Sequence, residues 1–403
     1  MNESEFRNLL NTHLLPMISG TSLGATRPAK PQHTLVAYGG NQLSLLMKPF
    51  KDAEYRVRLH RSQNFLPEER TLVGLFIQEV ANIQSQSDQD YFGDLIVLLP
   101  RRVIGKLLGD GVQGRKTLED AIQWFESLAS QTYEGKQIVA ALGITGSVSH
   151  GKVTINELAK GEDFAKVLSN GFDTMYVCGK DGRVFNLRCL KIGNFVPKSL
   201  YRMDGITNWC TNKRVAIVLN RNGEILVFKN KLLQFSKRGG KWRYYPHEST
   251  LQRLGIGLRR EIKNAIYDSC LDVSFARTGG CIALLTRDGE REINKKKFVN
   301  SDDWIENPKK IRTKLLNSAV KKPFQNLDRR LRQELLAMDG AIILSHTGAL
   351  LTAGSIIKVP GGSSGGGGRE AAARNLSKLG LGIKISADGP ITGFKKKREI
   401  FSI

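Results

Sequence analysis

The sequence predicts an α/β protein in which an N-terminal α/β region and a strand-rich region precede a C-terminal mixed-sheet α/β domain. Apolar strand-like runs alternate with helical patterns early in the chain, short strands with Asp-Gly and Asn-Gly turns follow, and helices alternate with strands again near the end. The 403 residues, 40% of them hydrophobic, suffice for two or three cores. We divide the chain into 1–33, 34–170, 171–248 and 249–403.

The region 1–33 combines a helix with a connector. An amphipathic pattern runs from Phe6 to Met17 and predicts the helix. The stretch from Ser19 to Pro31 is rich in Gly, Ser, Thr and Pro, which is typical of a connector.

The region 34–170 shows the alternation of a small α/β unit. Leu95–Leu99 and Ile138–Ile144 are apolar runs of strand length, whereas Glu68–Gln84 and Thr117–Ser130 have helical spacing. We therefore expect strands and helices to alternate here.

The region 171–248 is expected to form a mostly antiparallel sheet. Met175–Leu187 and Val215–Phe228 each contain two apolar segments around an Asp-Gly or Asn-Gly pair, which predicts hairpins. Arg238-Gly239-Gly240 marks a further turn.

The region 249–403 has a mixed α/β pattern. A long helical pattern covers Leu251–Val273, and Cys281–Thr286 is expected to form a strand that returns after Asp288-Gly289. The later elements are a basic helical stretch from Lys295 to Arg332, a strand at Ala341–Leu344 with a turn at His346-Thr347-Gly348, a glycine-rich loop, a short helix and a strand at Ile383–Ser386.

The charge balance points to a negatively charged partner. Lys and Arg number 61 against 38 Asp and Glu, a net charge of +23, which suits nucleic acid, nucleotide phosphates or an acidic protein surface. The basic stretch from Lys295 to Arg332 contains few aromatic residues, so a solvated helix face is the simpler interpretation.

Other features limit the class of protein. The five cysteines are not spaced as zinc ligands or as a disulfide framework. No apolar run approaches the roughly 20 residues that span a bilayer, so we expect no membrane partner. Because Met1-Asn2-Glu3-Ser4-Glu5 is acidic where a secretory leader is basic, we expect a cytoplasmic protein.

The first candidate site element is Asp339-Gly340-Ala341. An Asp at the mouth of a buried strand, followed by two small residues, places a carboxylate where a ligand can approach the backbone. Such a carboxylate can hold a divalent metal. Asp-Gly is also an ordinary turn, so the tripeptide alone is weak evidence.

The second element is a glycine-rich run that opens a helix. Gly361 to Gly368 leads into Arg369-Glu370 and an alanine-rich segment. Free N–H groups at a helix N-terminus attract anions, and Arg adds a planar fork for phosphate oxygens. A flexible linker is the alternative, but the run lies between two strand-like segments of one domain. No Gly-Lys-Ser/Thr follows, so this is not a Walker loop.

The third element is Ser386-Ala387-Asp388 after the strand at Ile383. Ser386 and Asp388 either line the same pocket or make the turn that Asp-Gly-Pro predicts.

Taken together, the elements resemble the diadenylate cyclase domain family. That family has Thr-Gly-Ala before a strand, Asp-Gly-Ala on the next hairpin, Gly-Thr-Arg-His-Arg at a helix start and Ser-Glu-Glu after a strand. The matching stretches, within about the last 150 residues, are Arg277–Leu284, Met338–Ile343, Gly367–Ala373 and Ile385–Asp388.

The resemblance implies nucleotide chemistry. In the family, two nucleotide-loaded domains meet face to face and join two ATP molecules into cyclic di-AMP with a metal, Mg²⁺ or Mn²⁺, so a homodimer is implied. Asp339 would then bind the metal and activate the 3′-hydroxyl, and Arg369 would hold phosphate. The implied nucleotide-binding residues are Gly340, Ala341, Gly367, Gly368, Arg369, Glu370 and Ser386.

Departures from the family pattern change the expectation. Glu370 and Ala371 stand where the family has His and Arg, and a carboxylate there is expected to repel a triphosphate. Such departures resemble those of diverged nucleotide-sensor domains in bacterial signalling and anti-phage systems.

Three functions follow as hypotheses. The first is a sensor that binds ATP or a cyclic nucleotide and signals to an effector protein. The second is an active diadenylate cyclase or nucleotidyltransferase. The third is a nucleic-acid-binding protein that uses the positive charge. The N-terminal half predicts no activity.

Overall fold

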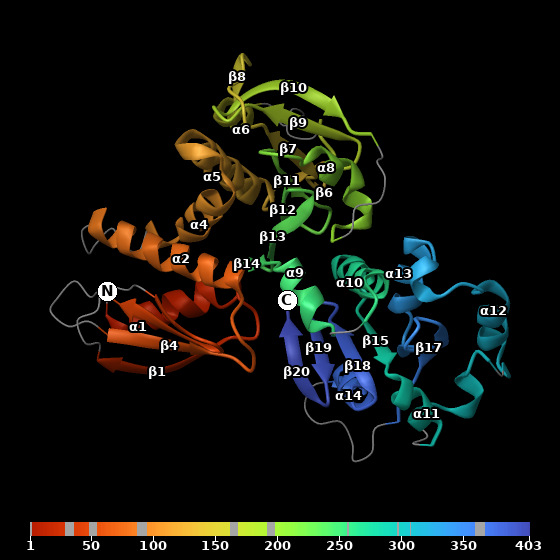
Figure 1. Ribbon diagram of the computed structural model, residues 1–403. Coiled ribbons are helices and arrows are strands. Elements are labelled where there is room, and N and C mark those ends of the chain that lie inside the picture. The colour runs from red at the N-terminus through yellow and green to blue at the C-terminus, as the bar shows by residue number, and fades with distance from the viewer. Residues whose placement is uncertain are drawn as a thin grey trace. The chain divides into compact units, whose positions relative to one another are not determined.

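The computed structural model describes ten stretches of the chain and divides them between two compact units, Met1–Pro246 and His247–Ile403 (Figure 1). The described residues are 2–28, 36–47, 55–86, 95–161, 168–191, 198–255, 258–295, 298–306, 308–358 and 367–403.

The first unit begins with a four-stranded antiparallel sheet and helices. Strands β1 (Ser22–Pro28), β4 (Tyr55–His60), β3 (Gln42–Met47) and β2 (Val36–Gly39) lie in that order. Helix α1 (Glu3–Leu9), a π-helical turn (Leu10–Leu14) and α2 (Pro67–Gln86) confirm the two predicted helical patterns.

The predicted connector from Ser19 to Pro31 is wrong in part, because it contains β1. Its Gly, Thr and Pro residues have weak strand preference. The backbone of β1 nevertheless pairs with β4, from Ser22 beside His60 to Pro28 beside Tyr55. A partner more than 25 residues away along the chain supplies this pairing, and local composition does not reveal it.

The predicted strand at Leu95–Leu99 is also wrong. In this run Leu95 and Ile96 are helical, Val97 and Leu98 form a turn, and Leu99 begins helix α4 (Leu99–Leu108), which precedes α5 (Gly111–Leu128). Pro100 suits the first helical turn, and Val103, Ile104 and Leu108 continue the buried face at helical spacing. A five-residue apolar run fits either structure until the residues after it are considered.

The large sheet of the first unit has eight strands in the order β14-β13-β12-β11-β7-β9-β10-β8. Neighbouring strands are antiparallel except for the parallel pair β7 and β9. The predicted hairpins form β9 with β10 and β11 with β12. The strand bounds are β7 Ala140–Ile144, β8 Val153–Thr154, β9 Thr174–Cys178, β10 Arg183–Cys189, β11 Val215–Leu219, β12 Ile225–Lys229, β13 Leu232–Arg238 and β14 Lys241–Tyr244.

Because β7 and β8 lie before residue 171 and β9 to β14 after it, this sheet takes strands from both sides of the division proposed at 170/171. Helix α5 packs against β7 and β11. Two short helices, α6 (Ile155–Lys160) and α8 (Asp204–Trp209), and a two-stranded ribbon of β5 (Thr132–Tyr133) and β6 (Lys136–Gln137) complete the main elements.

The mixed sheet that the sequence predicts is present in the second unit, and it has six strands in the order β17-β16-β15-β18-β19-β20. Only β15 and β16 are parallel. The strand bounds are β15 Gly280–Leu285, β16 Ala341–Leu344, β17 Leu350–Ser355, β18 Gly380–Ile385, β19 Ile391–Lys395 and β20 Arg398–Ser402. The helices are α9 His247–Arg253, α10 Arg260–Phe275, α11 Arg287–Lys295, α12 Ile311–Ala319, α13 Arg329–Ala337 and α14 Gly367–Leu376.

Two expectations for this unit need correction. The helix predicted over Leu251–Val273 is divided into α9 and α10. The return strand predicted after Asp288-Gly289 is instead α11, where Gly289 N–H donates to the Thr286 hydroxyl oxygen at 3.0 Å. This hydrogen bond satisfies a free N–H of the first helical turn, so Asp-Gly begins a helix here and not a hairpin.

The two faces of this sheet are covered by different helices. Residues of α14 pack in one core with Cys281, Ala283 and Leu285 of β15. The same core contains Ile343 of β16 and Phe394 of β19. Helices α10 and α13 contact each other, and the buried pair of Asp272 and Arg329 joins them. The sheet is therefore a fixed platform whose strand ends determine where functional side chains lie.

Candidate functional site

The four stretches that resemble the cyclase family meet at one edge of the six-stranded sheet (Figure 1). Strands β15 and β16 are parallel, so both begin at this edge. Strand β18 is antiparallel to β15 and ends there, because Ile385 pairs with Gly280. Helix α14 packs on β18 and β15 and brings Arg369 to the same edge.

Glycines line these strand ends. Gly279 has φ +70°, Gly340 has φ +96° and Gly354, near the end of β17, has φ +66°. A Cβ on Gly340 would lie 2.5 Å from the carbonyl carbon of Gly354, so these two backbones approach too closely for a side chain. We call Gly279, Gly340 and Gly354 the glycine row. It lets the Arg369 side chain approach the backbone at Gly279 and the Arg312 side chain approach it at Gly354.

Arg369 lies against one end of the glycine row. A Cβ on Gly279 would be 2.5 Å from Nη1 of Arg369 and 3.1 Å from the carbonyl oxygen of Ile385. Within the described ranges, no carboxylate pairs with this half-buried guanidinium. Burial raises the pKa of the nearby Cys281 thiol to about 12, so the thiol is neutral at pH 7 and does not offset the arginine charge.

Asp339 lies at the middle of the glycine row. Continuing the β15 and β16 register from the Ile282 and Ile342 pair by two residues puts Gly340 beside Gly280. The Asp339 side chain is exposed, and its Oδ1 accepts a hydrogen bond from Gly340 N–H at 3.0 Å. An exposed carboxylate can accept further hydrogen bonds from a ligand.

The remaining predicted residues differ in accessibility. Ala341 is fully buried in β16, whereas Ser386 is half-buried and its backbone makes the predicted turn with Pro390. Gly367 and Gly368 open α14, and a Cβ on either would meet none of the described residues within 4 Å. The rest of the predicted glycine loop, 361–366, lies outside the described residues.

Glu370 forms ion pairs with its own helix and sheet. Its Oε1 accepts from Arg374 Nε at 2.9 Å and its Oε2 from Lys384 Nζ at 3.0 Å. Partial burial alone would raise the pKa of Glu370, but the hydrogen bonds and charges of the two cations outweigh burial and lower it. These cations also offset the negative charge that is expected to repel a triphosphate.

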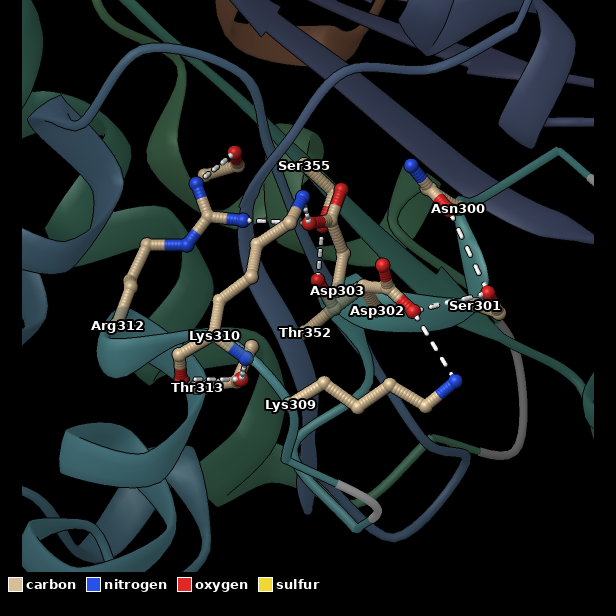
Figure 2. A network of polar contacts seen from close by, with 11 residues as sticks. Asn300, Ser301, Asp302, Asp303, Lys309, Lys310, Arg312, Thr313, Thr352 and Ser355 are labelled. Carbon is tan, nitrogen blue, oxygen red and sulfur yellow. Dashed lines mark hydrogen bonds and ion pairs between the residues drawn. The ribbon is translucent and has the colours of Figure 1, made fainter.

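A second arginine, Arg312, contacts Gly354 at the other end of the glycine row. Figure 2 shows it beside Asp303 and Lys310. Its Nη1 donates to the carbonyl oxygen of Gly354 at 2.7 Å, and its Nη2 lies 2.9 Å from Oδ1 of Asp303. Lys310 reaches the same Asp303 oxygen at 2.7 Å. Sequence reasoning missed Arg312 because it is one of many cations in a stretch interpreted as a solvated helix face. No sequence signal separates it from the other cations of that stretch, because its contacts with Asp303 and Gly354 arise only in the fold.

The described residues do not form a resident metal site. They contain no group of three or more His, Cys, Asp or Glu side chains placed to hold a metal ion. Asp339 would be a lone carboxylate ligand for Mg²⁺ or Mn²⁺, which is a poor fit to a metal that the protein holds by itself.

A cavity of about 960 Å³ lies elsewhere in the same unit, between α11, the segment at 299–306 and β17. Trp304 and Lys358 line it together with apolar residues such as Leu351. Asp339, Arg369 and Ser386 are not among its lining residues. This cavity is thus a separate location where a ligand could bind.

Comparisons with known proteins add no relative. No protein-family model matches the chain, and a search of curated proteins finds no significant match. Within the described part of the chain, every helix is too short or too polar to cross a bilayer.

Proposed function

We propose that the unit His247–Ile403 binds a nucleotide or cyclic oligonucleotide and acts as a sensor of it in bacterial signalling or anti-phage defence. One observation carries the proposal. Arg369 is half-buried, its guanidinium has no carboxylate partner among the described residues, and it lies against the backbone of Gly279 at the start of β15. A buried or half-buried cation is costly without an anion, and a phosphate group supplies one.

The N-terminus of α14 supports the same role. Gly367 and Gly368 leave the first turn of this ten-residue helix open to a ligand. The free N–H groups of that turn and the Arg369 side chain belong to one segment, so both can contact one phosphate.

A sensor is favoured over an enzyme by what the site does not provide. The described residues contain no group of three or more side chains placed to hold a metal ion. Glu370 and Ala371 replace two phosphate-binding positions of the family, and Glu370 is already paired with Arg374 and Lys384. Binding by positive charge needs neither feature, whereas phosphoryl transfer depends on neutralising the charge on the transferred group.

An active cyclase is the second candidate, and the exposed carboxylate of Asp339 is the observation that favours it. Incubation of the protein with ATP and Mg²⁺ or Mn²⁺ separates the two candidates. A cyclic dinucleotide product that disappears in the Asp339→Asn variant would establish the enzyme and exclude the pure sensor.

Calorimetry and thermal shift with AMP, ATP and cyclic di-AMP test the sensor. We expect at least one of them to bind, and Arg369→Ala to weaken that binding by about tenfold or more, because a charge-assisted hydrogen bond is lost. Arg291→Ala, which removes an exposed arginine of α11, is the matched control and should not change the affinity.

Other outcomes would contradict the proposal. If Trp304→Ala abolishes binding and Arg369→Ala does not, the ligand occupies the cavity and the site is wrong. Steeply salt-dependent binding of a nucleic-acid duplex that ignores Asp339→Asn and Arg369→Ala would instead favour the third hypothesis.

A further inference from the structure

We infer that Arg312 is a second phosphate-binding residue of the same site, and that the ligand is a nucleotide with at least two phosphate groups. This inference rests on the proposed function. It assigns one phosphate to Arg369 at one end of the glycine row and another to Arg312 at the opposite end.

Arg312 adjoins Asp339 through the backbone of Gly354. A Cβ on Gly354 would be 3.1 Å from Nη1 of Arg312 and 3.2 Å from the carbonyl oxygen of Asp339. The Arg312 guanidinium and the Asp339 carbonyl group therefore both lie beside Gly354, although Arg312 and Asp339 are 27 positions apart in the sequence.

The two arginines are spaced for separate phosphates. Gly354, Gly340 and Gly279 lie at the ends of β17, β16 and β15, which are consecutive strands of the sheet. Strands in a sheet are about 4.8 Å apart, so the backbone contacts of Arg312 and Arg369 are two steps, or about 10 Å, from each other. Backbone contacts at that separation favour one phosphate group at each arginine over a single shared phosphate group.

Arg312 is held in position and keeps donors for a ligand. Asp303, whose side chain is 7% exposed, accepts from Arg312 and Lys310 and fixes the segment that carries them (Figure 2). The Arg312 side chain is 34% exposed. A guanidinium has five N–H groups. Among the described residues, Gly354 accepts from one N–H at Nη1 and Asp303 accepts from one N–H at Nη2.

Asp303 does not cancel the positive charge of the cluster. One carboxylate faces two cations, Lys310 and Arg312, so the group keeps a net charge of about +1. Lys309 is different, because it pairs with Asp302 at 3.3 Å and both side chains are exposed (Figure 2). Asp303 is therefore a positioning residue for Arg312, and Lys309 has no role at the sheet edge.

The test compares ligands with one phosphate and with two or more. Calorimetry on the full chain should give tighter binding of ADP, ATP or cyclic di-AMP than of AMP. Arg312→Ala should weaken the two-phosphate ligand about tenfold or more and AMP less than about threefold. Of the two-phosphate ligands, ADP and ATP report a pyrophosphate chain and cyclic di-AMP reports separate phosphodiesters.

Lys309→Ala is the matched control, since it removes one positive charge from the same segment without touching the glycine row. Equal effects of Arg312→Ala and Lys309→Ala would overturn the inference, because only general charge would then matter. The same conclusion holds if AMP binds as tightly as the two-phosphate ligands.

Two further measurements distinguish an effect of Arg312→Ala on folding from an effect on ligand binding. Lys310 remains paired with Asp303 in Arg312→Ala, so the melting temperature without ligand should stay within a few degrees of the wild type. If that variant unfolds, Arg312→Lys keeps the charge and loses the fork, and it should weaken the two-phosphate ligand by a smaller factor. If no nucleotide binds the wild-type protein, the proposed function is refuted as well. If Arg369→Ala loses binding and Arg312→Ala does not, only the inference is refuted.

Discussion

Arg369 differs in its surroundings from three arginines that are more deeply buried. Arg61, Arg238 and Arg329 each have side chains at most 5% exposed and pair with Glu69, Glu224 and Asp272. A buried charge is tolerated when a partner neutralises it. Arg369 has no such carboxylate in the described part of the chain, so an external anion is the natural partner.

Glu370, the residue after Arg369, pairs with cations of its own unit, whereas Arg369 has no carboxylate partner among the described residues. Its charge is used within the unit, where it joins α14 to β18 through Arg374 and Lys384. The Arg374 guanidinium also lies 4.3 Å from the centre of the Phe394 ring. This arrangement stabilises the helix that carries Arg369, and it reduces the field of Glu370 near Arg369.

We predict that Glu370→Gln destabilises the protein at pH 7 by about 1 kcal/mol. The pKa of Glu370 is lowered in the folded state, so its contribution is present above the unfolded pKa and is lost as the pH falls through the folded value. Urea unfolding at pH 7 and at pH values well below 4.5 should show the difference between wild type and variant shrinking.

Glu334→Gln is the control, because Glu334 is an exposed residue of α13. It should change the unfolding free energy little at either pH. A Glu370→Gln effect that is as large in acid as at neutral pH would show that the ion pairs are not its cause. A rise in nucleotide affinity in this variant would instead show that Glu370 repels phosphate.

At the scale of elements, the site depends on where strands start and stop. Gly340 turns the chain into β16 with φ +96°, and its close approach to Gly354 accompanies irregular pairing between β16 and β17. Such irregularities change the direction of side chains near a strand end. The exposed position of Asp339 therefore follows from backbone geometry that few residues other than glycine adopt.

Gly340→Ala should destabilise the second unit by about 2 kcal/mol or more. A Cβ there would meet backbone atoms of Gly354 at 2.5 and 2.8 Å, and the positive φ adds strain. Gly368→Ala is the matched substitution, since its Cβ meets nothing within 4 Å, and we expect a change within about 0.5 kcal/mol. Chemical denaturation measures both, and equal stabilities would contradict the strain argument.

The sequence predicts elements well where local signals agree. Hairpins with Asp-Gly or Asn-Gly turns form as expected at β9 with β10 and at β11 with β12, because the turn and the alternation favour the same structure. Another Asp-Gly pair, Asp288-Gly289, lies in the first turn of helix α11, because the Thr286 hydroxyl accepts a hydrogen bond from Gly289 N–H. Strand β1 depends on pairing with β4, which local patterns do not encode.

Only the linear motifs of the candidate site could be predicted from the sequence. Asp339, Arg369 and Ser386 stand out by type and by order, and sheet topology brings their segments to one edge. The pairing of Glu370 and the approach of Arg312 to Gly354 depend on side-chain contacts across the fold. Such contacts link residues that share no motif, so the sequence alone does not reveal them.

At the scale of the whole molecule, both units carry positive charge. Residues 247–403 contain 28 Lys and Arg against 16 Asp and Glu, a net +12, which leaves +11 for residues 1–246. The unit with the candidate site therefore carries about half of the net charge on fewer than half of the residues. Net positive charge attracts anions in general, so under the proposed function discrimination among them comes from local groups such as Arg369 and Arg312.

The second unit has the features of a domain that folds alone. It contains a complete six-stranded sheet, with helices on both faces and its own core. Helix α9 belongs to it, because the buried His247 Nδ1 lies 2.8 Å from the Tyr267 hydroxyl and α9 also contacts β20. The boundary therefore falls before His247, and not at the start of α10.

We predict that a fragment of residues 247–403 unfolds in one cooperative transition and binds the same nucleotide as the full chain within a few fold. A fragment of residues 258–403 should be less stable, because it lacks α9 and leaves the Tyr267 hydroxyl without its partner His247. Thermal unfolding followed by circular dichroism, with and without ligand, measures both properties. If residues 247–403 fold and yet bind no nucleotide that the full chain binds, the first unit must contribute to the site, and a site made by the sheet edge alone is refuted.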